Sequence, residues 1–95
     1  MELSEIRTEL DRLDTELVEC LSERFLLTKK VAEAKYAMGK PLVDKEREES
    51  LIKDRTMKFT QKGINDPYFV EKLFRLIIEE SLKIEKAHLK SLHLK

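Results

Sequence analysis

Residues 3–38 read LSEIRTELDRLDTELVECLSERFLLTKKVAEAKYAM, and this stretch decides the fold. Non-polar side chains recur along it at alternating steps of three and four residues, which is the repeat of a helix with a coiled-coil-like seam. The seam positions are Leu3, Ile6, Leu10, Leu13, Leu17, Cys20, Arg24, Leu27, Val31, Ala34 and Met38. The pattern predicts one long helix, with Ser4 as a candidate cap and with Gly39 and Pro41 marking its end.

The predicted helix is too long for a compact monomer. At about 1.5 Å per residue it extends over about 54 Å. A compact globule of 95 residues has a diameter of only about 32 Å. The seam of the overhanging part needs an apolar partner, and a second copy of the chain is the simplest one. We therefore expect a homodimer. Cys20 is expected to be a small core residue.

Two shorter helices are expected after the long one. Asp44 is placed to cap a helix that ends near Gly63. Asp66 and Pro67 mark the start of a third helix, which is expected to run to about His88 before the chain frays. The composition agrees, because the chain has only two Gly and two Pro and 40% charged residues. The prediction is a single all-α domain over residues 1–95, with one long and two shorter helices.

Composition and charge exclude several classes of function. The 19 Lys and Arg residues balance the 19 Asp and Glu residues, and the two signs alternate along the chain. This leaves no basic stripe for a nucleic acid or a membrane surface. No apolar run is long enough to span a membrane, and the charged start MELSEIRTEL is not typical of a signal peptide. We expect a cytoplasmic protein that binds neither nucleic acid nor membrane.

A metal or cofactor site is not expected either. His88 and His93 lie close to the C-terminus, and Cys20 lies in the seam, so these residues do not form a metal-ligand set. Two glycines are too few for a loop that cradles phosphates. No serine has a credible histidine base, which argues against a hydrolytic triad.

Five polar side chains stand where apolar ones are expected. Arg24 occupies the seam itself, and Arg7 and Lys35 lie on one edge of it. Ser81 and Glu85 lie on the apolar side of the third helix. A buried guanidinium is costly unless an anion from the protein or from a ligand matches it. Together these residues predict a pocket for a small anion that carries more than one carboxylate.

Each of these residues also has an ordinary structural explanation. Arg7 could form an interhelical salt bridge, and Lys35 suits the C-terminus of a helix. Arg24 could form a buried pair with Glu48 or Glu85. Ser81 could donate a hydrogen bond to the preceding helical turn, and Glu85 could be exposed after a small rotation of its helix. Asp44, a further candidate, could be only an N-cap.

The sequence resembles the all-helical class of chorismate mutases over nearly its whole length. The segments that carry the resemblance are LSEIRTELDRLDTELVECLSERFLLTKKVAEAK, KPLVDKERE and LFRLIIEES. It implies an intertwined homodimer of three helices per chain. It also implies the Claisen rearrangement of chorismate to prephenate without a cofactor. One alternative is an isochorismate pyruvate lyase on the same fold. The other is a non-catalytic helical dimer that regulates a partner enzyme, with Arg24 and Lys35 in salt bridges and no open pocket.

The resemblance also implies roles for individual residues. Arg7 from the other subunit, Arg24 and Arg47 would hold the two carboxylates of the chorismate dianion. Lys35 would face the ether oxygen, where negative charge develops. Glu48 would accept a hydrogen bond from the ring hydroxyl.

Asp44 and Ser81 correspond to further substrate contacts, and Glu85 corresponds to the polar residue one turn after Ser81. The well-known bacterial pattern has glutamine at that position. A glutamate can donate a hydrogen bond to the ether oxygen only when it is protonated. The expected catalytic residues are therefore Lys35, Glu85 and Arg24, and turnover is expected to fall as pH rises. The expected apolar walls are Val31, Leu51, Ile78 and Leu82.

Overall fold

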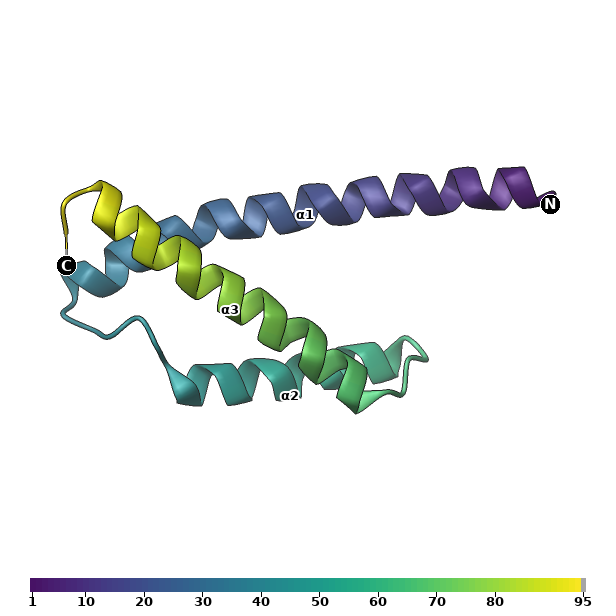
Figure 1. Ribbon diagram of the computed structural model, residues 1–95. Helices are drawn as coiled ribbons and strands as arrows, with labels where there is room; N and C mark the ends of the chain where they lie inside the picture. The colour runs from purple at the N-terminus through teal and green to yellow at the C-terminus, as the bar shows by residue number, and fades with distance from the viewer. Residues whose placement is uncertain (95) are drawn as a thin grey trace.

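The computed structural model describes residues 1–94 and contains three helices in that range, α1 (Leu3–Ala37), α2 (Lys45–Gln61) and α3 (Pro67–Ser91) (Figure 1). No β-strand occurs in residues 1–94. The predicted all-α class, with one long and two shorter helices, is confirmed. Among the described residues, no helix is both long enough and apolar enough to cross a membrane.

Local sequence signals set most of the helix ends. Gly39 follows α1 with a φ of +67°, and the N–H of Lys40 donates to the carbonyl of Lys35 at 2.9 Å, which closes the helix. The carboxylate of Asp44 accepts the N–H of Arg47 at 3.0 Å. The equivalent bond at α3 runs from the N–H of Phe69 to Asp66 at 3.1 Å. Both aspartates are therefore the caps that the sequence predicted.

Two predicted helix ends are wrong. Ser4 does not cap α1, because the cap is Glu2, two residues earlier, where Glu5 Oε1 accepts the N–H of Glu2 at 3.1 Å. The third helix does not stop at His88 but continues to Ser91. Leu89 is buried in this last turn, and its packing holds the turn in place.

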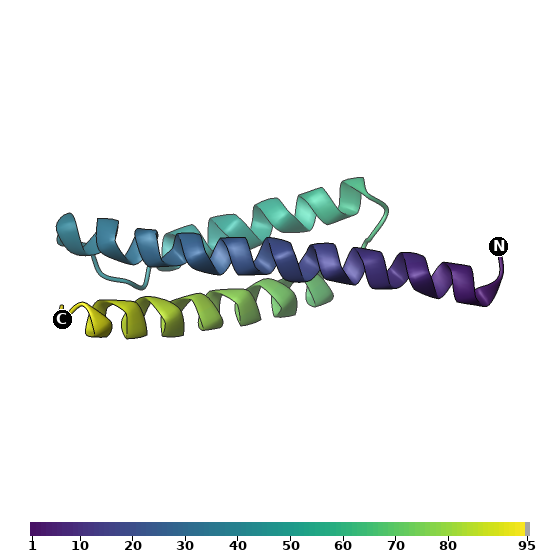
Figure 2. The ribbon, with the colours of Figure 1, turned by 90° about the horizontal axis from the view of Figure 1, so that it is seen from above.

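Helix α3 connects the other two helices. It packs against α1 along its C-terminal half and against α2 along its N-terminal half, whereas the backbones of α1 and α2 do not approach each other (Figures 1 and 2). A small core lies along α3, and its buried apolar residues are Ala32, Leu51, Ile52, Val70, Ile77 and Leu89. The space between α1 and α2 is therefore left for side chains that reach across it.

The N-terminal end of α1 extends beyond the ends of the other two helices (Figure 2). The longest dimension of the molecule is 54 Å, and every residue from 1 to 20 is exposed. Leu10 and Leu17 keep 53% and 57% of their surface accessible. Cys20 is also exposed, so it is not a core residue within a single chain, because nothing in the same chain covers this part of the seam. The predicted overhang is confirmed, and the homodimer stays a prediction.

Candidate active site

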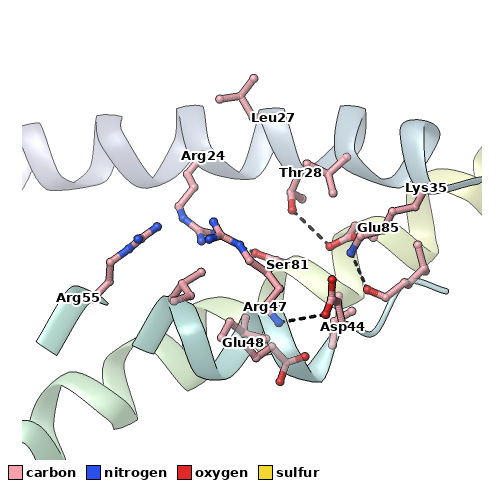
Figure 3. Close-up of a pocket in the computed structure, with 15 residues that line it drawn as sticks. Arg24, Leu27, Thr28, Lys35, Asp44, Arg47, Glu48, Arg55, Ser81 and Glu85 are labelled. Carbon is pink, nitrogen blue, oxygen red and sulfur yellow. Dashed lines mark hydrogen bonds and ion pairs between the residues drawn. The ribbon is translucent and has the colours of Figure 1, made fainter. Parts of the chain in front are cut away.

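A pocket of about 470 Å³ lies between α1 and α2, with α3 at its back (Figure 3). This volume is within the range of about 300–1,000 Å³ that is usual for small-molecule sites. The lining residues come from all three helices and the loop before α2: Arg24, Leu27, Thr28, Val31, Lys35, Leu42, Asp44, Arg47, Glu48, Leu51, Arg55, Ile78, Ser81, Leu82 and Glu85. Four of them are cations, three carry carboxyl groups, two carry hydroxyl groups, and the other six are apolar.

Arg24 is half-buried and reaches from α1 across the pocket. Its Nη1 donates to Ser81 Oγ at 3.3 Å. Burial lowers the pKa of Arg24, and the positive charges of Arg55 and Arg47 lower it further. No carboxylate of residues 1–94 forms an ion pair with Arg24, so the expected alternative of a buried pair with Glu48 or Glu85 is wrong. Its charge faces the pocket without a protein anion beside it.

Lys35 and Glu85 meet at the opposite end of the pocket. Lys35 Nζ lies 3.4 Å from Glu85 Oε1 and donates to the carbonyl of Leu42 at 2.6 Å. Thr28 Oγ1 donates to the other oxygen, Glu85 Oε2, at 3.4 Å. Only 4% of Glu85 is exposed, so the carboxyl is not turned outward by a helix rotation. The link to Leu42 also fixes the loop that leads to α2.

The start of α2 forms one wall of the pocket. Asp44 faces the pocket while its carboxylate caps the helix. Arg47 is exposed at the mouth. Glu48 is further inside, and its Oε1 lies 3.4 Å from Nη1 of Arg75, which comes from α3. The second nitrogen of the same guanidinium, Nη2, lies 2.7 Å from Glu49. Arg75 therefore holds the carboxylate of Glu48 from behind, outside the pocket.

The fold brings seven of the eight predicted site residues to this pocket, namely Arg24, Lys35, Asp44, Arg47, Glu48, Ser81 and Glu85. The four residues expected as apolar walls, Val31, Leu51, Ile78 and Leu82, also line it. Arg7 does not. It is exposed on the overhanging half of α1, about 26 Å of helix away from Arg24. No bending of a regular helix would bring it into the pocket of its own chain.

Sequence reasoning missed two polar residues of the pocket. Thr28 is one of them, because its bond to Glu85 depends on how α1 packs against α3. Arg55, on the second helix, is the other, and it also lines the pocket. Arg47, Leu51 and Arg55 follow one another at steps of four residues, so they share one helix face. That spacing was the available signal.

Comparison with known proteins identifies the family. Residues 6–86 match the family model described as chorismate mutase type II. A chorismate mutase of Methanocaldococcus jannaschii is 36% identical over 92% of this chain and 87% of its own length. A bifunctional chorismate mutase/prephenate dehydratase of Buchnera aphidicola subsp. Schizaphis graminum is 34% identical over 90% of this chain and 22% of its own length.

The corresponding bifunctional protein of Escherichia coli K12 is 32% identical over 86% of this chain and 21% of its own length. The chain therefore spans about a fifth of these two bifunctional relatives, and most of the first relative. No solved structure matches the chain. The family model covers most of the helical region, including every residue that lines the pocket. The chain thus belongs to the chorismate mutase type II family, and its activity is that of a chorismate mutase, an isomerase.

Proposed function

We propose that the pocket between the three helices is the site at which chorismate rearranges to prephenate. The observation that carries this proposal is the guanidinium of Arg24, which faces an open pocket without a carboxylate partner among residues 1–94. A regulatory helical dimer without an active site would be expected to neutralise Arg24 and fill the cavity. A dianion entering the pocket would supply the missing negative charge.

The reaction breaks one C–O ether bond and forms one C–C bond within a single molecule, so it needs no nucleophile or electron carrier. Catalysis then consists of holding the compact conformer of the substrate and of stabilising the charge that develops on the ether oxygen. Arg24, with Ser81 beside it, binds one substrate carboxylate. Arg47, which is exposed at the edge of the pocket, contributes a second guanidinium for the substrate carboxylates. A planar guanidinium can fix a carboxylate through two parallel bonds, which restricts its orientation.

Lys35 and Glu85 act on the ether oxygen. They are adjacent in the free protein, 3.4 Å apart, and Lys35 is held in position by the carbonyl of Leu42. In the transition state the ammonium of Lys35 offsets the growing negative charge. Glu85 assists only as a neutral acid, because an ionised carboxylate would repel the same oxygen.

The start of α2 binds the ring hydroxyl. Glu48 lines the pocket while Arg75 pairs with its carboxylate, and in this proposal it accepts a hydrogen bond from that hydroxyl. Asp44 contributes through its position at the cap of α2, where the backbone turns toward the pocket. Both assignments follow the implied family pattern and agree with the location of these residues.

A second copy of the chain completes each site. The exposed apolar seam of residues 3–17 requires cover, and Arg7 lies on the edge of that seam. When two chains pair along α1, Arg7 of one protomer is free to reach the pocket of its partner. We propose an intertwined homodimer with two shared sites. A single functional domain over residues 1–95 and a cytoplasmic location stay predictions from the sequence.

The test compares two substrates under identical conditions. The purified protein is incubated with chorismate or with isochorismate, while loss of the chorismate absorbance, formation of prephenate and release of pyruvate are measured. We expect prephenate from chorismate and little pyruvate from isochorismate. Pyruvate release without turnover of chorismate would assign the pocket to the lyase reaction instead. Turnover of neither substrate by a folded dimer would refute an enzymatic role.

A further inference from the structure

Arg55 is a cation of the pocket for which the proposed mechanism has no use. It lies on the same face of α2 as Arg47 and Leu51, and its side chain is 26% exposed. Figure 3 shows this side chain directed toward Arg24 across the end of the pocket that is remote from Lys35 and Glu85. Two guanidinium groups from opposite walls therefore face the same part of the cavity.

The position of Arg55 is held from its outer side. Its Nη1 donates to Asp54 Oδ2 at 2.6 Å, and Asp54 also pairs with Lys58 at 3.1 Å. The bonds from Arg55 and Lys58 keep the pKa of Asp54 below its usual value, so this carboxylate stays ionised. The guanidinium carbon of Arg55 lies 6.0 Å from the centre of the Phe74 ring. These contacts orient Arg55.

The arrangement is unfavourable in the absence of an anion. After burial itself, the positive charge of Arg55 lowers the pKa of Arg24 more than that of Arg47 does. Within residues 1–94, Asp54 is the only carboxylate that pairs with Arg55, and none pairs with Arg24. Asp54 is absent from the residues that line the pocket, so the space between the two guanidinium groups has no protein carboxylate. A ligand carboxylate in that space would offset the repulsion between Arg24 and Arg55, and it would accept hydrogen bonds from both guanidinium groups.

We propose that Arg55 is a further substrate-binding residue, and that with Arg24 it forms a two-guanidinium clamp for one carboxylate of the substrate. This rests on the proposed function, because the ligand is taken to be the chorismate dianion. In the proposed mechanism the ether bond breaks beside Lys35 and Glu85, and the clamp lies at the opposite end of the pocket. The carboxylate keeps its charge throughout the reaction, so the clamp binds substrate and transition state about equally.

The test measures kcat and KM of the full-length protein for chorismate. Arg55→Met removes the charge but keeps an unbranched side chain against Phe74. We expect KM to rise about 10- to 100-fold, as for a lost charge-assisted bond, while kcat changes less than about threefold. Arg55→Lys keeps the charge without the fork, so its KM should lie between those of Arg55→Met and wild type. The rise in KM with added salt should be weaker in Arg55→Met than in wild type.

Two neighbouring substitutions separate binding from a structural role. Lys58→Met is the matched control, because Lys58 pairs with the same Asp54 but does not line the pocket. Its KM should stay within about twofold of wild type. Asp54→Asn breaks the outer contact of Arg55 but leaves its charge beside the pocket. It should raise KM less than Arg55→Met does. If Asp54→Asn raises KM as much as Arg55→Met does, the effect comes from loss of the Asp54–Arg55 contact on the surface of α2, and the proposal is wrong.

The kinetic results also distinguish a failure of the proposed function from a failure of the clamp. A wild-type protein that does not turn over chorismate refutes the proposed function. A wild-type protein that is active, with an unchanged KM in folded Arg55→Met, refutes only the clamp. Folding of each variant is checked by circular dichroism and by its oligomeric state. Should Arg55→Met fail to fold, Arg55→Lys decides, because a wild-type KM in that variant would exclude a fork-specific contact.

Discussion

Subunit complementation is the sharpest test of the shared site. Arg7 and Arg24 are separated by about 26 Å along a continuous helix, so one chain cannot bring both to one pocket. In the proposed homodimer each pocket takes Arg24 from one protomer and Arg7 from the other. Chains carrying Arg7→Ala and chains carrying Arg24→Ala are then defective in different halves of the site. A heterodimer of the two has one complete pocket and one pocket that lacks both arginines.

The size of the recovery follows from this arrangement. Loss of one charge-assisted contact lowers kcat/KM of each parent homodimer by about 10- to 150-fold. Random exchange of an equimolar mixture makes about half of the dimers heterodimers, so about a quarter of all pockets are complete. The mixture should therefore show about a quarter of the wild-type activity per chain. That exceeds the activity of either parent, even at the mild end of the range.

The assay follows the loss of chorismate absorbance before and after exchange of two differently tagged chains, with exchange verified by native mass spectrometry. A mixture of Lys35→Ala with Arg24→Ala is the matched control. Both residues belong to the same protomer's half of the pocket, so no complete site can form and no activity should return. Verified heterodimers of the Arg7 and Arg24 variants that stay inactive would refute the shared-site arrangement.

Three further predictions concern Glu85, the exposed seam and the support of Glu48. Wild-type turnover should fall tenfold per pH unit once the solution is basic enough to deprotonate Glu85 in the complex, and Glu85→Gln should flatten this profile; identical profiles would exclude the neutral-acid role. Leu10→Asp should shift the protein from dimer to monomer in analytical ultracentrifugation and abolish activity, since it places a charge at a seam position that the proposed dimer would bury. An unchanged dimer would contradict pairing along α1. Arg75→Gln should lower kcat/KM about three- to tenfold, a modest effect because Arg75 is partly exposed, whereas Lys83→Gln on the same helix should have no effect; equal kinetics for the two variants would show that Glu48 needs no support.

Most features that depend on neighbours in the sequence were predictable, whereas features that depend on packing between helices were not. Asp44 and Asp66 were recognised as caps because the bond they accept comes from three residues further on. The prediction of Ser4 as the cap is wrong because Glu2 and Glu5 form the start of the helix, with the cap two residues earlier. The end of α3 was placed too early because the burial of Leu89 comes from packing against other parts of the chain.

The same distinction applies to the site. Arg24, Lys35, Ser81 and Glu85 could be found because each breaks an apolar pattern on its own helix. Arg75 breaks no pattern, and its contact with Glu48 joins positions that are 27 residues apart. Arg55 follows the spacing of an exposed helix face, which many surface arginines also do. Only the packing of α2 on α3 turns that face toward the cavity.

The exposed first half of α1 has a consequence for how the protein folds. Most of the stability of a helix in a protein comes from tertiary packing of its apolar face. Residues 1–20 have no such packing within their own chain, so in the proposed homodimer their order is gained at the moment of association. Folding and association then become one event, refolding is second order in chain concentration, and each tenfold dilution removes about 1.4 kcal/mol from the stability of the assembly.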